Sequence, residues 1–348
     1  MPDLNIRVEG RAGRITLSRP QALNAMTYEM CLAIDTVLKL WREEEHVSLV
    51  VIDAEGDKAF CAGGDIAELY DTGTRGDFAY GRQFWKDEYR LNAAMAAYPK
   101  PIVSLMQGFT MGGGVGIGCH GSHRVVDDSS RIAMPECGIG LVPDVGGSFL
   151  LARAPGHLGA YLGLTAARMN AGDAIHAGFA DLYIQRAKWA DLIELLEASG
   201  DIAHVLRFAE TAPVASLRPH FAEIDQLFAT PTLSGVHMAL NAAETDFARD
   251  TQKALSRNAP LSMACAIETI HRLQTASPTM HTALQLEYRF TWRAMEHGDF
   301  LEGIRAAIID KDRTPHWKFA DMNVPQDSID MMLAPLGPAE LTFEDEED

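Results

Sequence analysis

Apolar residues near the amino terminus follow first a strand spacing and then a helix spacing. Residues 4–18 alternate in strand fashion around Gly10 and Gly13, which predicts a β-hairpin. Thr27 precedes a stripe of apolar residues at helical spacing, over residues 30–40. A threonine at this place can accept a hydrogen bond from the first turn, so the pattern predicts a capped helix after the hairpin.

Nearly continuous apolar runs follow at residues 47–52 and 102–106. Such runs are typical of strands that are buried on both faces of a sheet. A helical pattern over about residues 78–97 separates them. Because strand and helix alternate, the first half of the chain is predicted to be α/β, with helices covering a largely parallel sheet.

Beyond about residue 190 the pattern becomes helical, for example at residues 191–198 and 284–295. At 348 residues the chain exceeds the usual size of one core, so more than one unit is expected. We therefore predict a core over residues 1–190, a helical domain over 191–335, and a tail over 336–348. Six of the last ten residues are acidic, which predicts a solvated, disordered tail.

The charge balance narrows the classes of partner. Thirty basic and 48 acidic residues give a net charge of -18, which argues against a nucleic-acid partner. No apolar run approaches the ~18 residues of a membrane helix, so no membrane partner is expected. Five scattered cysteines without a C-x-x-C pair, and a start without a targeting pattern, predict a cytoplasmic protein. The histidine spacing fits no metal motif.

Two glycine-rich stretches follow predicted strands, at residues 60–66 and 108–118. The second lacks the Lys-Ser/Thr of a Walker loop and does not fit a dinucleotide fingerprint. A glycine-rich helix start offers unpaired N–H groups and the positive end of the helix dipole, which suit an anionic oxygen. The simpler interpretation of the first stretch is a tight turn.

A third stretch, residues 134–148, places Glu136 and Asp144 among apolar residues and glycines. A carboxylate in poor solvation is costly unless it is paired or used in chemistry. Alternatively, one acid caps the helix that begins near Gly146 and the other bonds a backbone turn. Spacing alone leaves both interpretations open.

Taken together, these stretches read A-G-G-D-I, then M-G-G-G-V-G, then M-P-E-x-x-I-G-L-x-P-D-V-G-G. This order resembles the enoyl-CoA hydratase/isomerase (crotonase) family over about residues 4–190, with Leu-Asn-Ala-Met at 23–26 matching an early segment. The resemblance implies a crotonase-like spiral of ββα repeats with a carboxy-terminal helical domain, and an acyl-CoA substrate. It also implies an oxyanion hole formed by the backbone N–H groups of Gly64 and Gly113, which stabilises charge on the thioester oxygen.

Two departures distinguish branches of this family. Gly116 stands where typical hydratases carry a glutamate, and Asp144 follows Pro143 where they tend to have glycine. The resulting P-D-V-G-G pattern resembles a thioester-hydrolysing branch, as do the segments 287–289, 299–306, 309–312 and 315–317. The implied reaction is hydrolysis of a short 3-hydroxyacyl-CoA, 3-hydroxyisobutyryl-CoA, in valine breakdown.

The same resemblance implies roles for individual residues. Glu136 is expected to drive attack on the carbonyl, either as general base on water or as nucleophile. Asp144 is expected to orient the 3-hydroxy group or to assist proton transfer at the thiolate, and Glu88 to bind substrate. The expected CoA-binding residues are Asn24, Ala25, Ala62, Gly63 and Asp65.

Neither a cofactor nor a metal is expected, because CoA is part of the substrate. Relatives assemble as trimers or hexamers, so a homo-oligomer is expected with its stoichiometry open. Two other functions stay open: a hydratase or isomerase with the same oxyanion hole, and a non-enzymatic acyl-CoA-binding protein.

Overall fold

The computed structural model describes residues 3–343, which form two compact units built from three chain segments each. The first, here called the strand unit, comprises residues 3–65, 90–133 and 168–218. The second, the helical unit, comprises residues 66–89, 134–167 and 219–343. This division differs from the linear boundary that the sequence suggested near residue 190, because each unit gathers segments from both halves of the chain.

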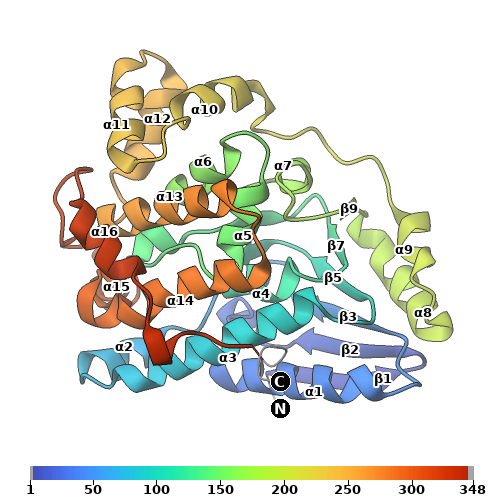
Figure 1. The fold of residues 1–348 in the computed structure, drawn as a ribbon. Coiled ribbons are helices and arrows are strands. Elements are labelled where there is room, and N and C mark those ends of the chain that lie inside the picture. Colours follow the sequence, from blue (N-terminus) through green and yellow to red (C-terminus); the bar gives the residue numbers. More distant parts are fainter. Residues whose placement is uncertain (1–2, 344–348) are drawn as a thin grey trace. The chain divides into compact units, whose positions relative to one another are not determined.

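The strand unit contains every strand among the described residues (Figure 1). Its strands are β1 (Leu4–Glu9), β2 (Ala12–Leu17), β3 (Leu49–Ala54), β4 (Ala59–Cys61), β5 (Ile102–Met106), β6 (Phe109–Met111), β7 (His123–Val126), β8 (Arg131–Ala133) and β9 (Leu182–Tyr183). Its helices are α1 (Tyr28–Glu43), α4 (Gly113–Gly118), α7 (Ala171–His176), α8 (Trp189–Ser199) and α9 (Ala203–Phe208).

The helical unit has no strand among its described residues. Its helices are α2 (Ala67–Thr74), α5 (Gly147–Arg153), α6 (Leu158–Thr165), α10 (Phe221–Leu227), α11 (Leu233–Ala242), α12 (Asp246–Leu255), α13 (Pro260–Thr275), α14 (Met280–His297), α15 (Phe300–Ile304) and α16 (Gln326–Leu333). The long helix α3 (Phe78–Ala96) contributes its residues up to Tyr89 to this unit and the rest to the strand unit.

The large sheet has the strand order β1-β2-β3-β5-β7-β9. Strands β1 and β2 pair antiparallel, which confirms the predicted hairpin, and every later pairing is parallel. The predicted strand at 102–106 is β5, and the strand predicted at 47–52 lies at 49–54 as β3.

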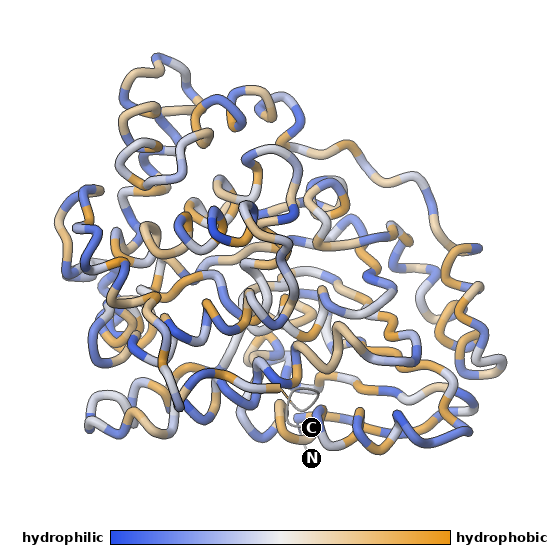
Figure 2. The backbone as a smooth tube through the Cα atoms, in the orientation of Figure 1, coloured by the Kyte–Doolittle hydropathy of each residue, from blue (hydrophilic) through white to orange (hydrophobic). Residues whose placement is uncertain are grey.

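Helices cover both faces of the large sheet, as the continuous apolar runs predicted. On one face, Leu49, Val51, Val103 and other alternate strand residues pack against α8 and α9 in one buried cluster. On the other face lies α1, whose Trp41 ring leaves no room for a side chain at Gly13, where a Cβ would come within 2.5 Å of it. Thr27 caps α1 by accepting a hydrogen bond from the Met30 N–H, as predicted. Hydrophilic and hydrophobic residues alternate along this helix (Figure 2).

Successive strands alternate between two sheets. Strands β3, β5 and β7 enter the large sheet, while β4, β6 and β8 form a three-stranded parallel sheet in the order β4-β6-β8. The chain thus repeats a pair of strands, one for each sheet, with helices following β4 and β6. This spiral of repeats, followed by helices α10 to α16, is the fold class that the family resemblance implied.

In the helical unit, α13 packs against α5, α6, α14 and α16 and buries eleven of its sixteen residues. The carboxy-terminal segment contacts α14, where Arg289 pairs with Glu340 at 2.7 Å and the His281 ring stacks on Phe343. Residues 336–343 are therefore packed, unlike the disordered tail expected from residue 336 onward. The acidic run 344–348 lies outside the described residues.

Candidate active site

Two loops of the strand unit carry the predicted oxyanion-hole residues. Gly64 follows β4 by three residues and Gly113 follows β6 by two, and these strands are parallel neighbours. Because parallel neighbours end at the same edge of a sheet, both loops leave from one edge. They also approach closely, since a Cβ on Gly114 would lie 2.1 Å from the Cys61 carbonyl oxygen. Only glycine fits at position 114 without moving this backbone.

The backbone N–H groups of Gly64 and Gly113 are available to a ligand. Within residues 3–343, neither N–H donates a hydrogen bond to the protein. Gly113 is the first residue of α4, where the N–H has no partner inside the helix. Gly64 forms a bridge with Met26, but the bonds of this bridge use Gly63 O and Asp65 N. The oxyanion-hole role stays a prediction, and both donors are compatible with it.

The residues predicted to bind CoA lie on two bonded segments of the strand unit. Ala62 N–H donates to Leu23 O at 3.0 Å, which joins the segment 62–65 to the turn at 23–26. The Asn24 amide donates to two carbonyls, Glu55 O and Ala59 O, at 2.9 Å each. Its oxygen accepts from Arg19 N–H at 2.9 Å. Asn24 is therefore a buried turn residue whose side chain is engaged within the protein.

The other members of this predicted set are more accessible. Ala25, Ala62, Gly63 and Asp65 are partly exposed. Asp65 pairs with Arg19 at 3.2 Å, with 37% of its side chain exposed. Backbone and side-chain groups on these four residues can reach a ligand, so their role in CoA binding stays a prediction.

In the helical unit, four buried carboxyl groups interact electrostatically with one another. They are Glu88, Glu136, Asp144 and Glu287, none more than 6% exposed. Among the described residues, no lysine, arginine or histidine forms an ion pair with any of them. Burial without a cation disfavours the charged form of a carboxyl group. Glu136 and Asp144 are thus buried acids, as their apolar sequence context indicated, and their role in chemistry stays a prediction.

Glu136 combines burial with an oxygen that has no protein partner. It begins a short 3-10 turn, Glu136–Ile139, directly after Pro135. Its Oε2 atom is buried and, in the part of the chain described, accepts no hydrogen bond. Burial raises the pKa of Glu136 well above that of an ordinary glutamate, and the charge on Asp144 raises it further. An unpartnered buried carboxyl oxygen can accept a hydrogen bond from a water molecule or a ligand. Asp53 Oδ1 and Asp299 Oδ2 share this feature, so it does not by itself mark a site.

Asp144 lies at a strained turn. Burial raises its pKa from 3.8 to about 7, although a hydrogen bond from the Tyr89 hydroxyl, at 2.7 Å, opposes this shift. The next residue, Val145, has φ 53°, in the left-handed region that β-branched residues rarely adopt. Backbone strain of this kind often occurs beside functional groups.

Glu88 lies on α3 one residue before Tyr89 and is 6% exposed. Burial, followed by the charge on Asp144, raises its pKa well above the usual range. It is therefore a buried acid near Asp144 rather than a residue of a solvated helix face. Its binding of substrate stays a prediction.

Sequence reasoning missed Glu287 and Tyr89 as members of this cluster. Glu287 is fully buried on α14, and burial raises its pKa to about 8 despite the hydrogen bonds that it accepts. One of these bonds comes from the Ser148 hydroxyl, so Ser148 serves as a donor here and lacks the features of a serine nucleophile. In the sequence, the sign of its burial is that Glu287 is an acid among the apolar residues of a helix, with Ala283, Leu284 and Tyr288 buried beside it.

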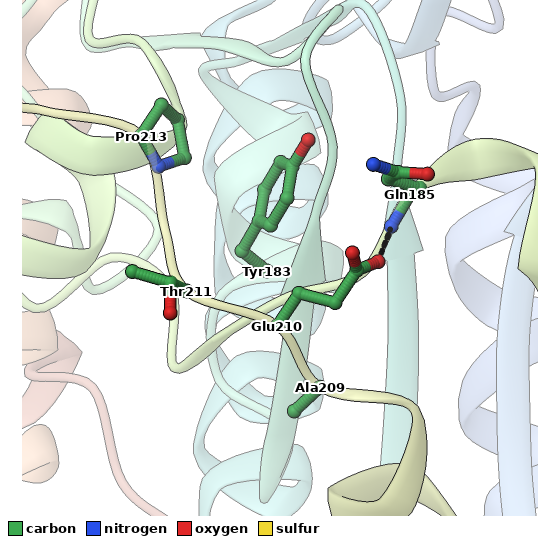
Figure 3. Close-up of a pocket in the computed structure, with 6 residues that line it drawn as sticks. All are labelled: Tyr183, Gln185, Ala209, Glu210, Thr211 and Pro213. Atoms are coloured by element: carbon green, nitrogen blue, oxygen red, sulfur yellow. Dashed lines mark hydrogen bonds between the residues drawn. The ribbon is translucent and has the colours of Figure 1, made fainter.

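A cavity of about 770 Å³ lies elsewhere in the strand unit. It is lined by Tyr183, Gln185, Ala209, Glu210, Thr211 and Pro213 (Figure 3). Glu210 also pairs with Lys188 at 3.0 Å, and the Tyr183 hydroxyl donates to Asp128. None of the predicted site residues lines this cavity.

Within residues 3–343, no group of three or more His, Cys, Asp or Glu side chains is arranged to hold a metal ion. No helix in that range combines the length and the apolar character needed to cross a membrane.

The chain belongs to the enoyl-CoA hydratase/isomerase family, whose model matches residues 12–333. Among curated proteins it is 38% identical to the mitochondrial 3-hydroxyisobutyryl-CoA hydrolase of Xenopus laevis, over 95% of this chain and 89% of the relative. It is 36% identical to the human protein of the same name, over 96% of this chain and 89% of that relative.

Two solved structures are similar over nearly the whole chain. An enoyl-CoA hydratase from Rhodobacter sphaeroides is 56% identical, with a TM-score of 0.95, and covers 98% of this chain and 100% of its own. A carnitinyl-CoA dehydratase from Mycobacterium thermoresistibile is 37% identical, with a TM-score of 0.93, and covers 99% of this chain and 100% of its own. These neighbours confirm the crotonase-type fold and its carboxy-terminal helices.

The same comparison corrects one prediction. The curated relatives are named as mitochondrial proteins, so the prediction of a cytoplasmic location is wrong by this comparison. Scattered reduced cysteines fit either compartment, because cysteine pattern alone does not separate two environments in which thiols can stay reduced.

Proposed function

We propose that this protein hydrolyses 3-hydroxyisobutyryl-CoA to 3-hydroxyisobutyrate and CoA. The observation that carries the proposal is the pair Glu136 and Asp144. Both are buried, they interact electrostatically, and neither forms an ion pair with a cation within residues 3–343. Curated relatives over nearly the full chain bear the name of this activity. CoA enters as part of the substrate, and the reaction as written uses no further cofactor.

In this proposal the thioester oxygen accepts hydrogen bonds from the N–H groups of Gly64 and Gly113. Two such donors stabilise the developing oxyanion, and each is typically worth about 3 to 4 kcal/mol of barrier. Glu136 follows β8 by three residues, and β8 belongs to the same small sheet as β4 and β6. In this proposal each of the three loops contributes one reacting group.

Glu136 starts the reaction from its unpartnered Oε2 atom. As general base it takes a proton from water while the water oxygen bonds to the carbonyl carbon. The C–S bond then breaks, and the proton passes to the departing sulfur to give CoA and the free acid. As nucleophile, Glu136 would instead form an anhydride that water cleaves to the same products. Hydroxylamine trapping of that anhydride distinguishes the two routes.

Asp144 is suited to hold the 3-hydroxy group or to assist proton transfer to sulfur. Its pKa of about 7 lets it exist in both protonation states near neutral pH. Glu88, a neighbouring buried acid, is proposed to contact the same end of the substrate.

A hydratase activity is the second candidate, because two structural neighbours carry hydratase or dehydratase titles at 56% and 37% identity. Against it, α4 holds only glycine, valine and isoleucine and is fully buried, so it provides no second acid after the triple glycine. The retained acid, Asp144, lies after a different strand.

A panel of acyl-CoA thioesters tests both candidates. Release of free thiol is followed with 3-hydroxyisobutyryl-CoA, 3-hydroxypropionyl-CoA and acetyl-CoA, and loss of the double bond with crotonyl-CoA. We expect thiol release, highest with the 3-hydroxy substrates. Consumption of crotonyl-CoA without thiol release selects the hydratase, and tight CoA binding with no turnover selects a non-enzymatic binding protein. Sedimentation of the same sample tests the expected homo-oligomer.

A further inference from the structure

Glu287 connects helix α14 to the turn that carries Asp144. Its Oε2 atom accepts a hydrogen bond from the Gly146 N–H at 2.8 Å. Its Oε1 atom accepts from the Ser148 N–H at 3.0 Å and from the Ser148 hydroxyl. Each carboxyl oxygen therefore meets a backbone N–H, which can act only as a donor. Nothing in the proposed reaction uses this carboxyl group directly.

The backbone that Glu287 holds is strained. Val145 has φ 53° and Gly146 has φ 76°, and the turn closes with the Gly147 N–H bonded to Asp144 O at 2.7 Å. A non-glycine residue in the left-handed region is strained and persists only where surrounding contacts fix it. The two N–H bonds to Glu287 are such contacts, because they lie immediately after the strained residue.

The same helix supports the Asp144 side chain by a second route. Tyr288, the next residue on α14, packs edge-to-face against Tyr89 with ring centroids 6.2 Å apart. The Tyr288 hydroxyl is itself fixed by donating to Arg82 O at 3.1 Å. Tyr89 in turn donates to Asp144 Oδ2 at 2.7 Å. Helix α14 thus positions both the backbone and the carboxylate of Asp144.

We infer that Glu287 is a positioning residue for Asp144: it fixes the turn 144–148 so that the Asp144 carboxylate meets the substrate in one orientation. The inference rests on the proposed function, in which Asp144 contacts the reacting molecule. Glu287 itself touches no substrate in this scheme. The Asp144 carboxylate must be held closely in place, because a displacement of about 1 Å at a reacting group can lower the rate about 100-fold.

The first test is the variant Glu287→Gln. Glutamine keeps the shape but turns an N–H₂ group toward one of the backbone N–H donors, so one bond is lost. We expect kcat for 3-hydroxyisobutyryl-CoA to fall about 100-fold, with KM within threefold of the wild type. The matched control is Glu340→Gln, which removes the charge of the carboxylate that accepts a hydrogen bond from Arg289 on helix α14. It should leave kcat unchanged.

A double-mutant cycle separates positioning of Asp144 from a general structural role. If Glu287 acts through Asp144, then Glu287→Gln should lower kcat by less than threefold in an Asp144→Asn background. A full further loss of about 100-fold in that background would overturn the inference, as would near-normal kcat in the single variant. If Glu287→Gln does not fold, Ser148→Ala replaces it as the test, because the alanine variant removes only the hydroxyl donor to Glu287. We expect it to lower kcat about fivefold, and unchanged kcat would count against the inference.

Failure of the proposed function is recognised separately. If wild type releases no thiol but hydrates crotonyl-CoA, the hydrolase proposal fails, and the same cycle is run on hydration. If the wild type has neither activity, crystal structures of the wild type and of Glu287→Gln test whether Glu287 fixes the turn at Asp144. The inference expects Val145 to leave the left-handed region in the variant and the bond from Tyr89 to Asp144 to be lost. An unchanged turn would overturn it.

Discussion

The two units bury charge in opposite ways. In the strand unit, Arg14 is 4% exposed and pairs with Asp53 at 2.5 Å and with Glu197. One buried cation there offsets two partly buried acids. In the helical unit, Glu136 and three other buried carboxyl groups have no cationic partner within residues 3–343. The first arrangement pairs opposite charges, and the second raises the pKa of its acids.

This contrast separates a structural use of buried charge from a chemical one. A paired charge is fixed in one protonation state and holds its elements in place. An unpaired acid with a raised pKa can take and return a proton near neutral pH, at a cost in stability. Substitution in the first cluster should therefore lower stability and leave activity unchanged, whereas substitution in the second should lower activity.

The largest expected effect is at Glu136. The variant Glu136→Gln keeps the shape but removes the base, so kcat should fall about 1,000-fold, within the range typical of general-base catalysis. CoA affinity, measured by calorimetry, should stay within threefold of the wild type. Retention of near-normal turnover would show that Glu136 has no such role.

Next in size is the loss of the buried cation. Arg14→Met leaves Asp53 and Glu197 without their partner, and we expect a loss of about 3 kcal/mol in the free energy of unfolding. Urea denaturation at pH 7 measures it, and kcat per folded molecule should not change. Arg7→Met is the control, because Arg7 forms an exposed pair with Glu9 and should cost less than about 1 kcal/mol. Equal losses in both variants would remove the contrast between the units.

A smaller effect is expected in the dependence of stability on pH. The folded pKa of Asp144 is about 7, above its ordinary value of 3.8, so between these values the folded state binds more protons than the unfolded state. This group's contribution to stability is therefore lost as pH rises from about 4 to about 7. Asp144→Asn should show a smaller decline than the wild type across that window. Identical declines in urea titrations of both proteins would contradict a raised pKa.

The smallest expected effect is at the exposed pair of Asp65 and Arg19. Asp65→Asn should change the free energy of unfolding by less than about 1 kcal/mol, because exposed ion pairs contribute little. If Asp65 also contacts CoA, KM should rise more than threefold while kcat stays constant. An unchanged KM would remove Asp65 from the predicted CoA site.

Much of the strand unit followed from local pattern. The hairpin at residues 4–17, the cap at Thr27 and the strand at 102–106 each depend on neighbours a few positions apart. The glycine segments could also be recognised in the sequence, because a close backbone approach such as that at Gly114 excludes any other residue. Apolar surroundings likewise predicted that Glu136 and Asp144 are buried.

The tertiary structure alone decided which groups those two acids meet. Glu287 and Tyr89 come from helices far along the chain, and nothing within a few residues of either signals the turn at Asp144. The division into interleaved units is also a long-range property, which a shift of composition near residue 190 could not reveal. Local patterns indicate which positions lie on an apolar face, because the periodicity is contained within one segment. The partners of a side chain depend on how distant segments pack, and that is settled only when the whole chain folds.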